Sequence, residues 1–301
     1  MLYDLIIVGS GPAGLSAALY AGRYKLKTLL LGAVLGGAMA EAWKIENYPG
    51  FKTIAGMELA KRIKEQVEDL GIEIFQDEVT KIQNPKSKFQ IVARSGKKFE
   101  SRALILALGT QRRKLNVPGE EKFHGRGVSY CATCDGILFQ NKVVAVVGGG
   151  DSAIKSGSLL VKYAKKVYLL VRGNELSGEP MNVEKVKSQK EKVKIIYGVE
   201  ILEIKGDSKV QSVVLNNGEE LKLDGVFIEI GATPASALIK DLKVDLDEKG
   251  YLKVDENQRT NIPFIYAAGD VATAMGGFKQ VLTAAAQGAV AATSVYKDLR
   301  G

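Results

Sequence analysis

Two cysteines are the residues of this chain best suited to chemistry, and they stand in one tetrapeptide, Cys131-Ala-Thr-Cys134. A pair at this spacing is typical of a redox-active dithiol or of a metal site. A structural zinc site needs four cysteine or histidine ligands, and the chain has no second cysteine pair and one histidine, His124. We therefore expect no metal and interpret the pair as a dithiol/disulfide couple. Two inert core thiols are the less favoured alternative.

Asp135 follows the pair directly and is a candidate for proton transfer to and from a thiol. The alternative is a helix cap, in which the carboxylate accepts a hydrogen bond from a backbone N–H. Cys131, Cys134 and Asp135 are therefore the candidate catalytic residues.

A glycine-rich turn occurs twice, each time between an apolar strand and a helical pattern. Residues 3–8 lead into Gly9-Ser-Gly-Pro-Ala-Gly14, and residues 142–147 lead into Gly148-Gly-Gly-Asp-Ser-Ala153. Such a unit binds dinucleotides, because the glycines let the backbone approach a pyrophosphate at the helix N-terminus. We expect two nucleotide sites. The alternative is a turn that keeps the fold but binds no ligand. This alternative has more support for the second copy than for the first.

Further strand patterns surround the second copy, and a small-residue helix closes the chain. Strands alternating with helices indicate an α/β fold, here of two Rossmann-like three-layer dinucleotide-binding domains. We expect the chain to cross between domains near residues 110–116 and 233–241. The other expected strands are 90–94, 99–100, 103–108, 193–197, 210–215, 225–230 and 265–271, and the closing helix is 281–299.

Composition narrows the class of protein. Hydrophobic residues make up 46% and charged residues 25%, as in globular proteins. The net charge of +8 suits an acidic partner, but no basic run is interleaved with aromatic residues, so we do not expect nucleic acid binding. No apolar run approaches the roughly 18 residues of a membrane span. The short apolar start lacks a basic leader, so we expect a cytoplasmic protein with no membrane partner.

Five segments together resemble the low-molecular-weight thioredoxin reductases, over almost the whole chain. The Cys-Ala-Thr-Cys-Asp-Gly segment before the second glycine turn separates the chain from glutathione-reductase-like enzymes, whose cysteine pair lies near the first turn. The segments are the two glycine turns, Glu46-Asn-Tyr-Pro-Gly50, Gly125-Arg-Gly-Val-Ser-Tyr-Cys-Ala-Thr-Cys-Asp-Gly136 and Ala268-Gly-Asp-Val271.

The resemblance implies a homodimeric flavoprotein that reduces thioredoxin or a thioredoxin-like protein. Residues 1–112 and 242–301 would form a discontinuous FAD-binding domain. Residues 113–241 would form an inserted NAD(P)-binding-like domain that carries the cysteine pair. Cys134 would face the flavin, and Cys131 would attack the disulfide of the partner.

The resemblance also assigns residues to FAD. The first turn would hold the pyrophosphate, Gly36 and Gly37 would lie near the adenosine, and Asn47 near the flavin. Gly269-Asp270 would hold the ribityl-phosphate region, and Lys279-Gln280 would approach the isoalloxazine. The full expected set is Gly9, Ser10, Gly11, Pro12, Ala13, Gly14, Gly36, Gly37, Asn47, Val79, Gly109, Gly269, Asp270, Lys279 and Gln280.

The second nucleotide site departs from the family pattern. The family grips the NADPH 2′-phosphate with several arginines, of which only Arg172 is present here. A Glu-Glu-Ala segment expected after the turn is replaced by Lys155-Ser156-Gly157. The residues left for a nucleotide are Gly148, Gly150, Asp151, Ser152, Ala153 and Arg172.

The electron donor therefore stays open among three classes: weakly bound NADPH or NADH, another small donor such as a reduced deazaflavin, or an acidic electron-transfer protein such as ferredoxin. Two rival functions remain at this point. One is a flavoprotein that supplies electrons to a peroxidase partner, and the other is a non-catalytic flavin-binding protein.

Overall fold

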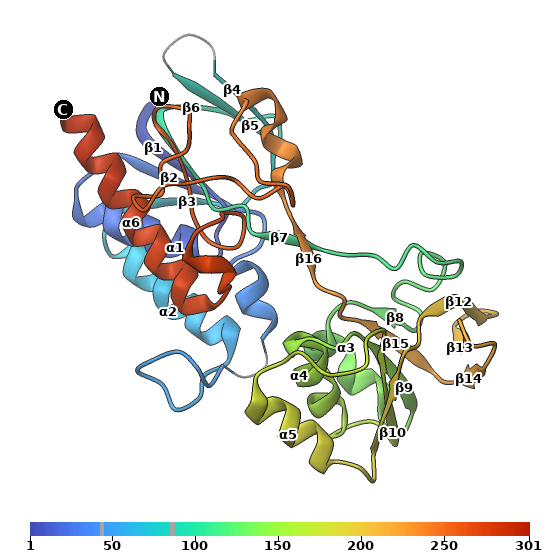
Figure 1. The fold of residues 1–301 in the computed structure, drawn as a ribbon. Helices are drawn as coiled ribbons and strands as arrows, with labels where there is room; N and C mark the ends of the chain where they lie inside the picture. The colour runs from blue at the N-terminus through green and yellow to red at the C-terminus, as the bar shows by residue number, and fades with distance from the viewer. Residues whose placement is uncertain (43–44, 85–87) are drawn as a thin grey trace. The chain divides into compact units, whose positions relative to one another are not determined.

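A computed structural model describes residues 1–42, 45–84 and 88–301. The chain forms two compact units (Figure 1). Unit 1 comprises Met1–Gln111 and Thr233–Gly301, and unit 2 comprises Arg112–Ala232. The second unit is thus inserted into the first, and the expected α/β class is confirmed.

The sheet of unit 1 is built around β1, which pairs in parallel with β2 and β6. Strand β1 is apolar at nearly every position because both faces of the sheet are covered. The order is β3 (Glu73–Phe75), β2 (Thr28–Leu31), β1 (Leu2–Val8), β6 (Lys98–Leu106), β5 (Phe89–Ala93) and β4 (Val79–Gln83), with β17 (Ile265–Ala267) also paired to β6.

Alternate residues of β1 enter two different cores. Leu5 and Ile7 pack with three helices, α1 (Pro12–Arg23), α2 (Gly56–Glu68) and α6 (Val281–Arg300). Ile6 and Val8 pack on the opposite face with β4, β5 and the 3₁₀ segment η3 (Ser236–Leu242). Unit 1 therefore has three layers. Two short 3₁₀ segments, η1 (Gly37–Glu41) and η4 (Met275–Gly277), complete its helical elements, and Met39 of η1 packs in the first of the two cores.

Strand β6 differs from the sequence-based expectation of separate strands at 99–100 and 103–108. The structure has one strand, Lys98–Leu106. Its first half pairs antiparallel with β5, and its second half pairs in parallel with β1 and β17. The polar residues between the two halves, Ser101 and Arg102, therefore continue the strand instead of ending it.

Unit 2 repeats the layered plan. Its sheet has the order β11 (Val193–Tyr197), β10 (Lys166–Val171), β9 (Val143–Val147), β15 (Gly225–Ile228) and β8 (Val128–Ser129). One face packs on α4 (Asp151–Leu160) and α5 (Pro180–Ser188), and the other on a second sheet. That sheet consists of β12 (Ile201–Gly206), β13 (Val210–Leu215) and β14 (Glu220–Lys222). Two short helical segments, α3 (Ala132–Asp135) and η2 (Gly136–Phe139), lie between β8 and β9.

The crossings between the units are β7 (Thr110–Arg112) and β16 (Ala232–Pro234), which pair as a two-stranded sheet. Residues 233–241 belong to unit 1, whereas the sequence analysis assigned them to the inserted domain. The physical reason is burial: Ile239 and Leu242 lie in the core beneath the sheet of unit 1. Among the residues that the structure describes, no helix combines the length and apolar character needed to cross a membrane.

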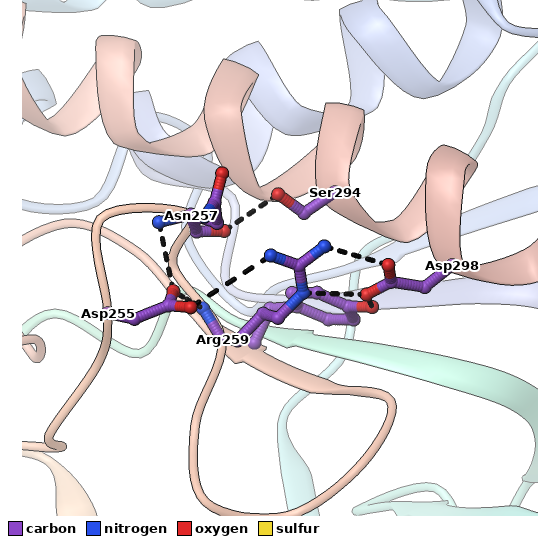
Figure 2. A network of polar contacts seen from close by, with 6 residues as sticks. Asp255, Asn257, Arg259, Ser294 and Asp298 are labelled. Carbon is purple, nitrogen blue, oxygen red and sulfur yellow. Dashed lines mark hydrogen bonds and ion pairs between the residues drawn. The ribbon is translucent and has the colours of Figure 1, made fainter.

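A polar network in unit 1 fastens the loop before β17 to α6 (Figure 2). Arg259 donates to both carboxylate oxygens of Asp298, from Nε at 2.8 Å and Nη2 at 2.7 Å. The buried Tyr266 hydroxyl donates to the same carboxylate at 2.6 Å. Ser294 donates to the Asn257 carbonyl at 2.8 Å. The hydrogen bond from Arg259 is the main cause of a lowered pKa at Asp298.

We predict that Asp298→Asn lowers the free energy of unfolding by about 1–2 kcal/mol at neutral pH, because a charged acceptor is lost. Since the folded protein lowers the pKa of Asp298, this stabilisation is present above the usual value of 3.8 and is lost as the pH falls through the folded value. Urea denaturation at pH 7 and at about pH 2, well below the usual value, tests this. An equal difference between wild type and variant at both pH values would contradict the prediction.

Candidate active site: a disulfide and two glycine turns

Cys131 and Cys134 form a disulfide with their Cα atoms 5.3 Å apart. The short strand β8 leads into the pair, and Cys131 is the N-cap of α3. Its Sγ accepts the N–H of Cys134 at 3.1 Å. The Ser129 hydroxyl accepts the Cys131 N–H at 3.0 Å and fixes the entry to the turn. Cys134 is exposed and Cys131 is half-buried, so the pair is a reachable disulfide and not two core thiols.

Asp135 is the last residue of α3, and its N–H donates to the Cys131 carbonyl at 3.1 Å. Asp135 is also the N-cap residue of η2, which is the position that the capping alternative requires. In the described part of the chain, its side chain makes no capping hydrogen bond to that segment. The geometry therefore leaves the carboxyl beside the disulfide, half-buried, and does not support the capping alternative.

The first glycine turn joins β1 to α1 and has the form of a phosphate cradle. Gly9 has φ +112°, and a Cβ there would collide with the Ala107 carbonyl. A Cβ at Gly14 would collide with the Gly9 carbonyl, so Gly14 lets the helix lie against the turn. A Cβ at Gly11 would meet only the Gly36 carbonyl, at 3.9 Å. Gly11 is also the N-cap of α1 and has no side chain over the helix N-terminus, which fits a bound pyrophosphate.

The structure brings most of the expected FAD residues together around this turn. The Gly36 N–H donates to the Ser10 carbonyl at 2.8 Å, and Gly37 lies against Gly11. Gly269 has φ +81°, and a Cβ there would lie 2.9 Å from the Ala13 Cβ. Residues far apart in sequence therefore meet at the amino end of α1, where Pro12 supplies the first helical position.

Asn47 and Gln280 also meet, since the Asn47 side chain donates to Gln280 Oε1 at 3.0 Å. Gly109 lies two residues beyond Ala107, and its carbonyl accepts the Ala235 N–H at 3.2 Å. Val79 is different: it opens β4, which β6 and β5 separate from β1. A place for Val79 at this site therefore has no support from the strand order.

Asp270 and Lys279 carry opposite charges in the same region of unit 1. Burial raises the pKa of the Asp270 carboxyl above its usual value, and the Lys279 ammonium opposes that rise. The ammonium itself lies over the Tyr251 ring, 3.3 Å from the centroid. Tyr251 was not among the residues expected from the sequence, because only the folded chain brings it to Lys279.

The second glycine turn joins β9 to α4 and keeps the same backbone form. A Cβ at Gly148 would collide with the Glu229 carbonyl, and one at Gly150 would meet only Ser177 Oγ, at 3.9 Å. Asp151 opens α4, with Ser152 and Ala153 after it, and is bonded by Lys155 and by Asn182 at 3.0 Å. Burial favours the neutral carboxyl, but these hydrogen bonds prevail and lower the pKa of Asp151.

Arg172 stands after β10, where the resemblance places the 2′-phosphate grip. Its side chain is 84% exposed, and its Nη1 lies 3.8 Å from a Glu200 carboxylate oxygen. In the pattern of the family that the chain resembles, further arginines are expected at the positions of Gly173 and Ser177. Ser177 instead donates its N–H to the Gly149 carbonyl at 2.8 Å. The cationic part of a 2′-phosphate site is therefore reduced to one arginine that faces a carboxylate.

Glu229 is a polar residue that the sequence analysis missed. It follows β15 directly, and its side chain is 4% exposed. One carboxylate oxygen accepts the Ser156 hydroxyl at 2.8 Å, and the other accepts Arg112 Nη1 at 2.6 Å. The signal was present, since Glu229 is the one acidic residue within the otherwise apolar run 225–230. Strands β9 and β15 flank the point where the strand order reverses, so Glu229 lies where open α/β sheets bind ligands.

Comparison with known proteins agrees with this geometry. The sequence profile described as pyridine nucleotide-disulphide oxidoreductase matches residues 3–288, and the chain belongs to that family. The chain is thus an oxidoreductase of a family that works with a flavin and a pyridine nucleotide.

Full-length relatives narrow the similarity to the thioredoxin reductases of low molecular weight. The chain is 39% identical to a thioredoxin reductase of Listeria innocua, over 98% of this chain and 93% of the relative. A crystal structure of Lactococcus lactis thioredoxin reductase is 40% identical, covers 99% of both chains and has a TM-score of 0.93. A structure named ferredoxin-flavin thioredoxin reductase, from Clostridium acetobutylicum, is 34% identical over 99% of this chain and 98% of that one, with a TM-score of 0.55.

We predict that Arg112→Ala destabilises the protein by about 3 kcal/mol, because it removes a cation from the buried Glu229 carboxylate. The double variant Arg112→Ala/Glu229→Ala should be less destabilised than Arg112→Ala alone, since it leaves no buried charge. Arg113→Ala, which changes the next residue in the chain, is the matched control. Urea denaturation of all four proteins gives the comparison. A double variant less stable than Arg112→Ala would refute this account of the cluster.

Proposed function

We propose that this chain reduces the disulfide of thioredoxin or of a thioredoxin-like protein, with electrons delivered through FAD bound to unit 1. The observation that carries the proposal is the Cys131–Cys134 disulfide with its exposed Cys134, in a chain whose other unit has an open phosphate cradle. The relatives named thioredoxin reductase, which match nearly the full chain, support the choice of substrate.

The residues gathered around α1 would hold the FAD. The first glycine turn would bind the pyrophosphate through backbone N–H groups, with Gly36 and Gly37 beside the adenosine half. Gly269 and Asp270 would lie at the ribityl-phosphate region, and Asn47, Lys279 and Gln280 at the isoalloxazine. A bound flavin supplies two-electron chemistry between the donor and the cysteine disulfide.

The protein's own residues carry out the thiol exchange. Once the pair is reduced, the N–H that Cys134 donates to Cys131 Sγ favours the thiolate at Cys131. That thiolate attacks the partner disulfide, forms a mixed disulfide and releases one partner thiolate. Cys134 then displaces the second, which regenerates the Cys131–Cys134 disulfide. The partner gains two electrons and two protons, and Asp135 is the proposed group for proton transfer beside the pair.

We predict that Cys134→Ser traps the mixed disulfide with the partner, because the second displacement needs the Cys134 thiol. Cys131→Ser should form no adduct, and both variants should lose more than about 100-fold in turnover. Intact-mass analysis after reaction with oxidised thioredoxin measures the adduct. An adduct only for Cys131→Ser would mean that Cys134 attacks the partner disulfide and Cys131 resolves the mixed disulfide. Turnover near the wild-type rate in either variant would exclude the dithiol mechanism.

We further propose that tightly bound NADPH is not the electron donor and that an electron-transfer protein of the ferredoxin class is. The support is the single exposed Arg172 facing Glu200, and the absence of cations at Gly173 and Ser177 in the described chain. Each lost charge-assisted hydrogen bond weakens binding by about 1–3 kcal/mol. The name of the relative from Clostridium acetobutylicum supports the donor class.

We predict that reduced ferredoxin bleaches the flavin absorbance anaerobically, whereas micromolar NADPH or NADH does not. The variant Gly173→Arg/Ser177→Arg restores two cations, and a Cβ at Gly173 has room. It should raise the preference for NADPH over NADH at least tenfold, at about 1.4 kcal/mol per tenfold. Titration of wild type and variant with each donor is the measurement. Rapid bleaching of the wild-type flavin by NADPH would disprove the proposal on the donor.

Two further parts of the proposal concern the oligomeric state, which rests on the resemblance, and the location. The chain would act as a homodimer, which light scattering of the purified protein measures. A cytoplasmic location fits a cysteine pair that must cycle through its dithiol form.

A further inference from the structure

Lysines gather at the amino edge of the sheet of unit 2. Parallel strands begin at the same edge, so the residues that precede them become neighbours. Lys142 precedes β9, Lys165 precedes β10 and Lys192 precedes β11. Backbone hydrogen bonds fix their order: the Lys165 N–H donates to the Lys142 carbonyl at 2.8 Å, and the Val167 N–H donates to the Lys192 carbonyl at 2.8 Å.

Further lysines enlarge this group, which we call the lysine edge. Asp224 and Glu191 are the carboxylates among the residues next to the starts of β9, β10, β11 and β15 in the described chain. The Lys142 ammonium lies 3.7 Å from Asp224. Six lysines against two carboxylates give a formal charge of 6 − 2 = +4. The lysine edge comprises Lys142, Lys162, Lys165, Lys166, Lys190 and Lys192, of which all but Lys166 are exposed.

The disulfide segment leads directly to the lysine edge. The segment η2, which follows α3, packs on the end of α4: a Cβ at Gly136 would lie 3.1 Å from Leu160 and 3.5 Å from Tyr163. The Asn141 N–H then donates to the Tyr163 carbonyl at 2.9 Å, next to Lys142. The chain between the cysteines and this edge exposes the apolar side chain of Leu138 by 73%. Eight residue steps from Cys134 to Lys142 span at most about 29 Å, so a domain about 30 Å across that covers the disulfide can also reach the lysines.

We propose that the lysine edge is a docking surface for an acidic face of the protein that carries the substrate disulfide. Crowded like charges destabilise a folded domain, and an opposing charge removes that penalty on binding. The substrate fits this surface better than the electron donor does. The disulfide and the lysine edge belong to the same unit, whereas the donor must reach the flavin, which we place in unit 1.

This inference rests on the proposed function, and its test separates the two. The variant Lys162→Glu/Lys165→Glu reverses two charges of the lysine edge. The control Lys61→Glu/Lys98→Glu makes the same change in net charge at exposed lysines of unit 1. Each protein, reduced anaerobically with two equivalents of dithionite so that both the flavin and the cysteine pair are reduced, is mixed with an acidic oxidised thioredoxin at low and high salt. Stopped-flow absorbance follows flavin reoxidation. The same reaction with neutral 2-hydroxyethyl disulfide, which needs no docking, normalises the rates.

We expect the edge variant to lose at least about tenfold in the low-salt rate with thioredoxin, relative to the neutral disulfide, and to lose the salt dependence. The control variant should lose less than about twofold. Equal losses in the two variants would overturn the docking surface while leaving the proposed function intact. A larger effect on flavin reduction by ferredoxin than on thioredoxin reduction would assign the edge to the donor and likewise overturn the proposal. A wild-type protein that transfers no electrons to thioredoxin would instead refute the proposed function.

Discussion

The close approach of glycine backbone to the first turn of α1 is the constraint on which unit 1 depends. Gly14 lies on the Gly9 carbonyl, Gly288 of α6 lies on the Ala13 carbonyl, and Gly269 lies against Ala13. The first two contacts are with backbone carbonyls and the third is with the Ala13 Cβ, and a side chain added at any of the three glycines would collide with these atoms. The helix N-terminus is thereby fixed in position and left uncovered beside Gly11. The proposed cofactor site is a consequence of how the unit packs, and not an addition to it.

Unit 2 uses the same backbone arrangement with a different electrostatic content. Gly148 lies on the Glu229 carbonyl as Gly9 lies on that of Ala107, so both turns have a similar form. Around the second turn, however, the structure places the carboxylates of Asp151 and Glu229, each bonded to a basic side chain. The backbone conformation of the glycine turn is therefore similar in the two units, whereas the charged side chains beside the turn differ. This contrast explains why a shared glycine pattern does not imply a shared ligand.

Features encoded in short stretches could be predicted from the sequence, and those that depend on distant neighbours could not. The glycine turns, the strands before them and the disulfide each follow from a few consecutive residues. The return crossing was placed too late, because residues 233–241 bury Ile239 against a sheet face formed by other segments. The Glu229 cluster was missed since Arg112 lies 117 residues away in sequence. Contacts of this range need the folded chain, not a local pattern.

The paired crossings β7 and β16 have a consequence for how the chain folds. The ends of the inserted unit lie side by side, so unit 2 can close without any later part of the chain. Unit 1 cannot, because β17 and α6 come last in sequence and complete its sheet and its helical layer. During synthesis the inserted unit is therefore able to fold first, while an incomplete unit 1 keeps apolar surface exposed until the final segments emerge. By shortening the effective loop between β6 and β17, a folded unit 2 lowers the entropy cost of that last closure.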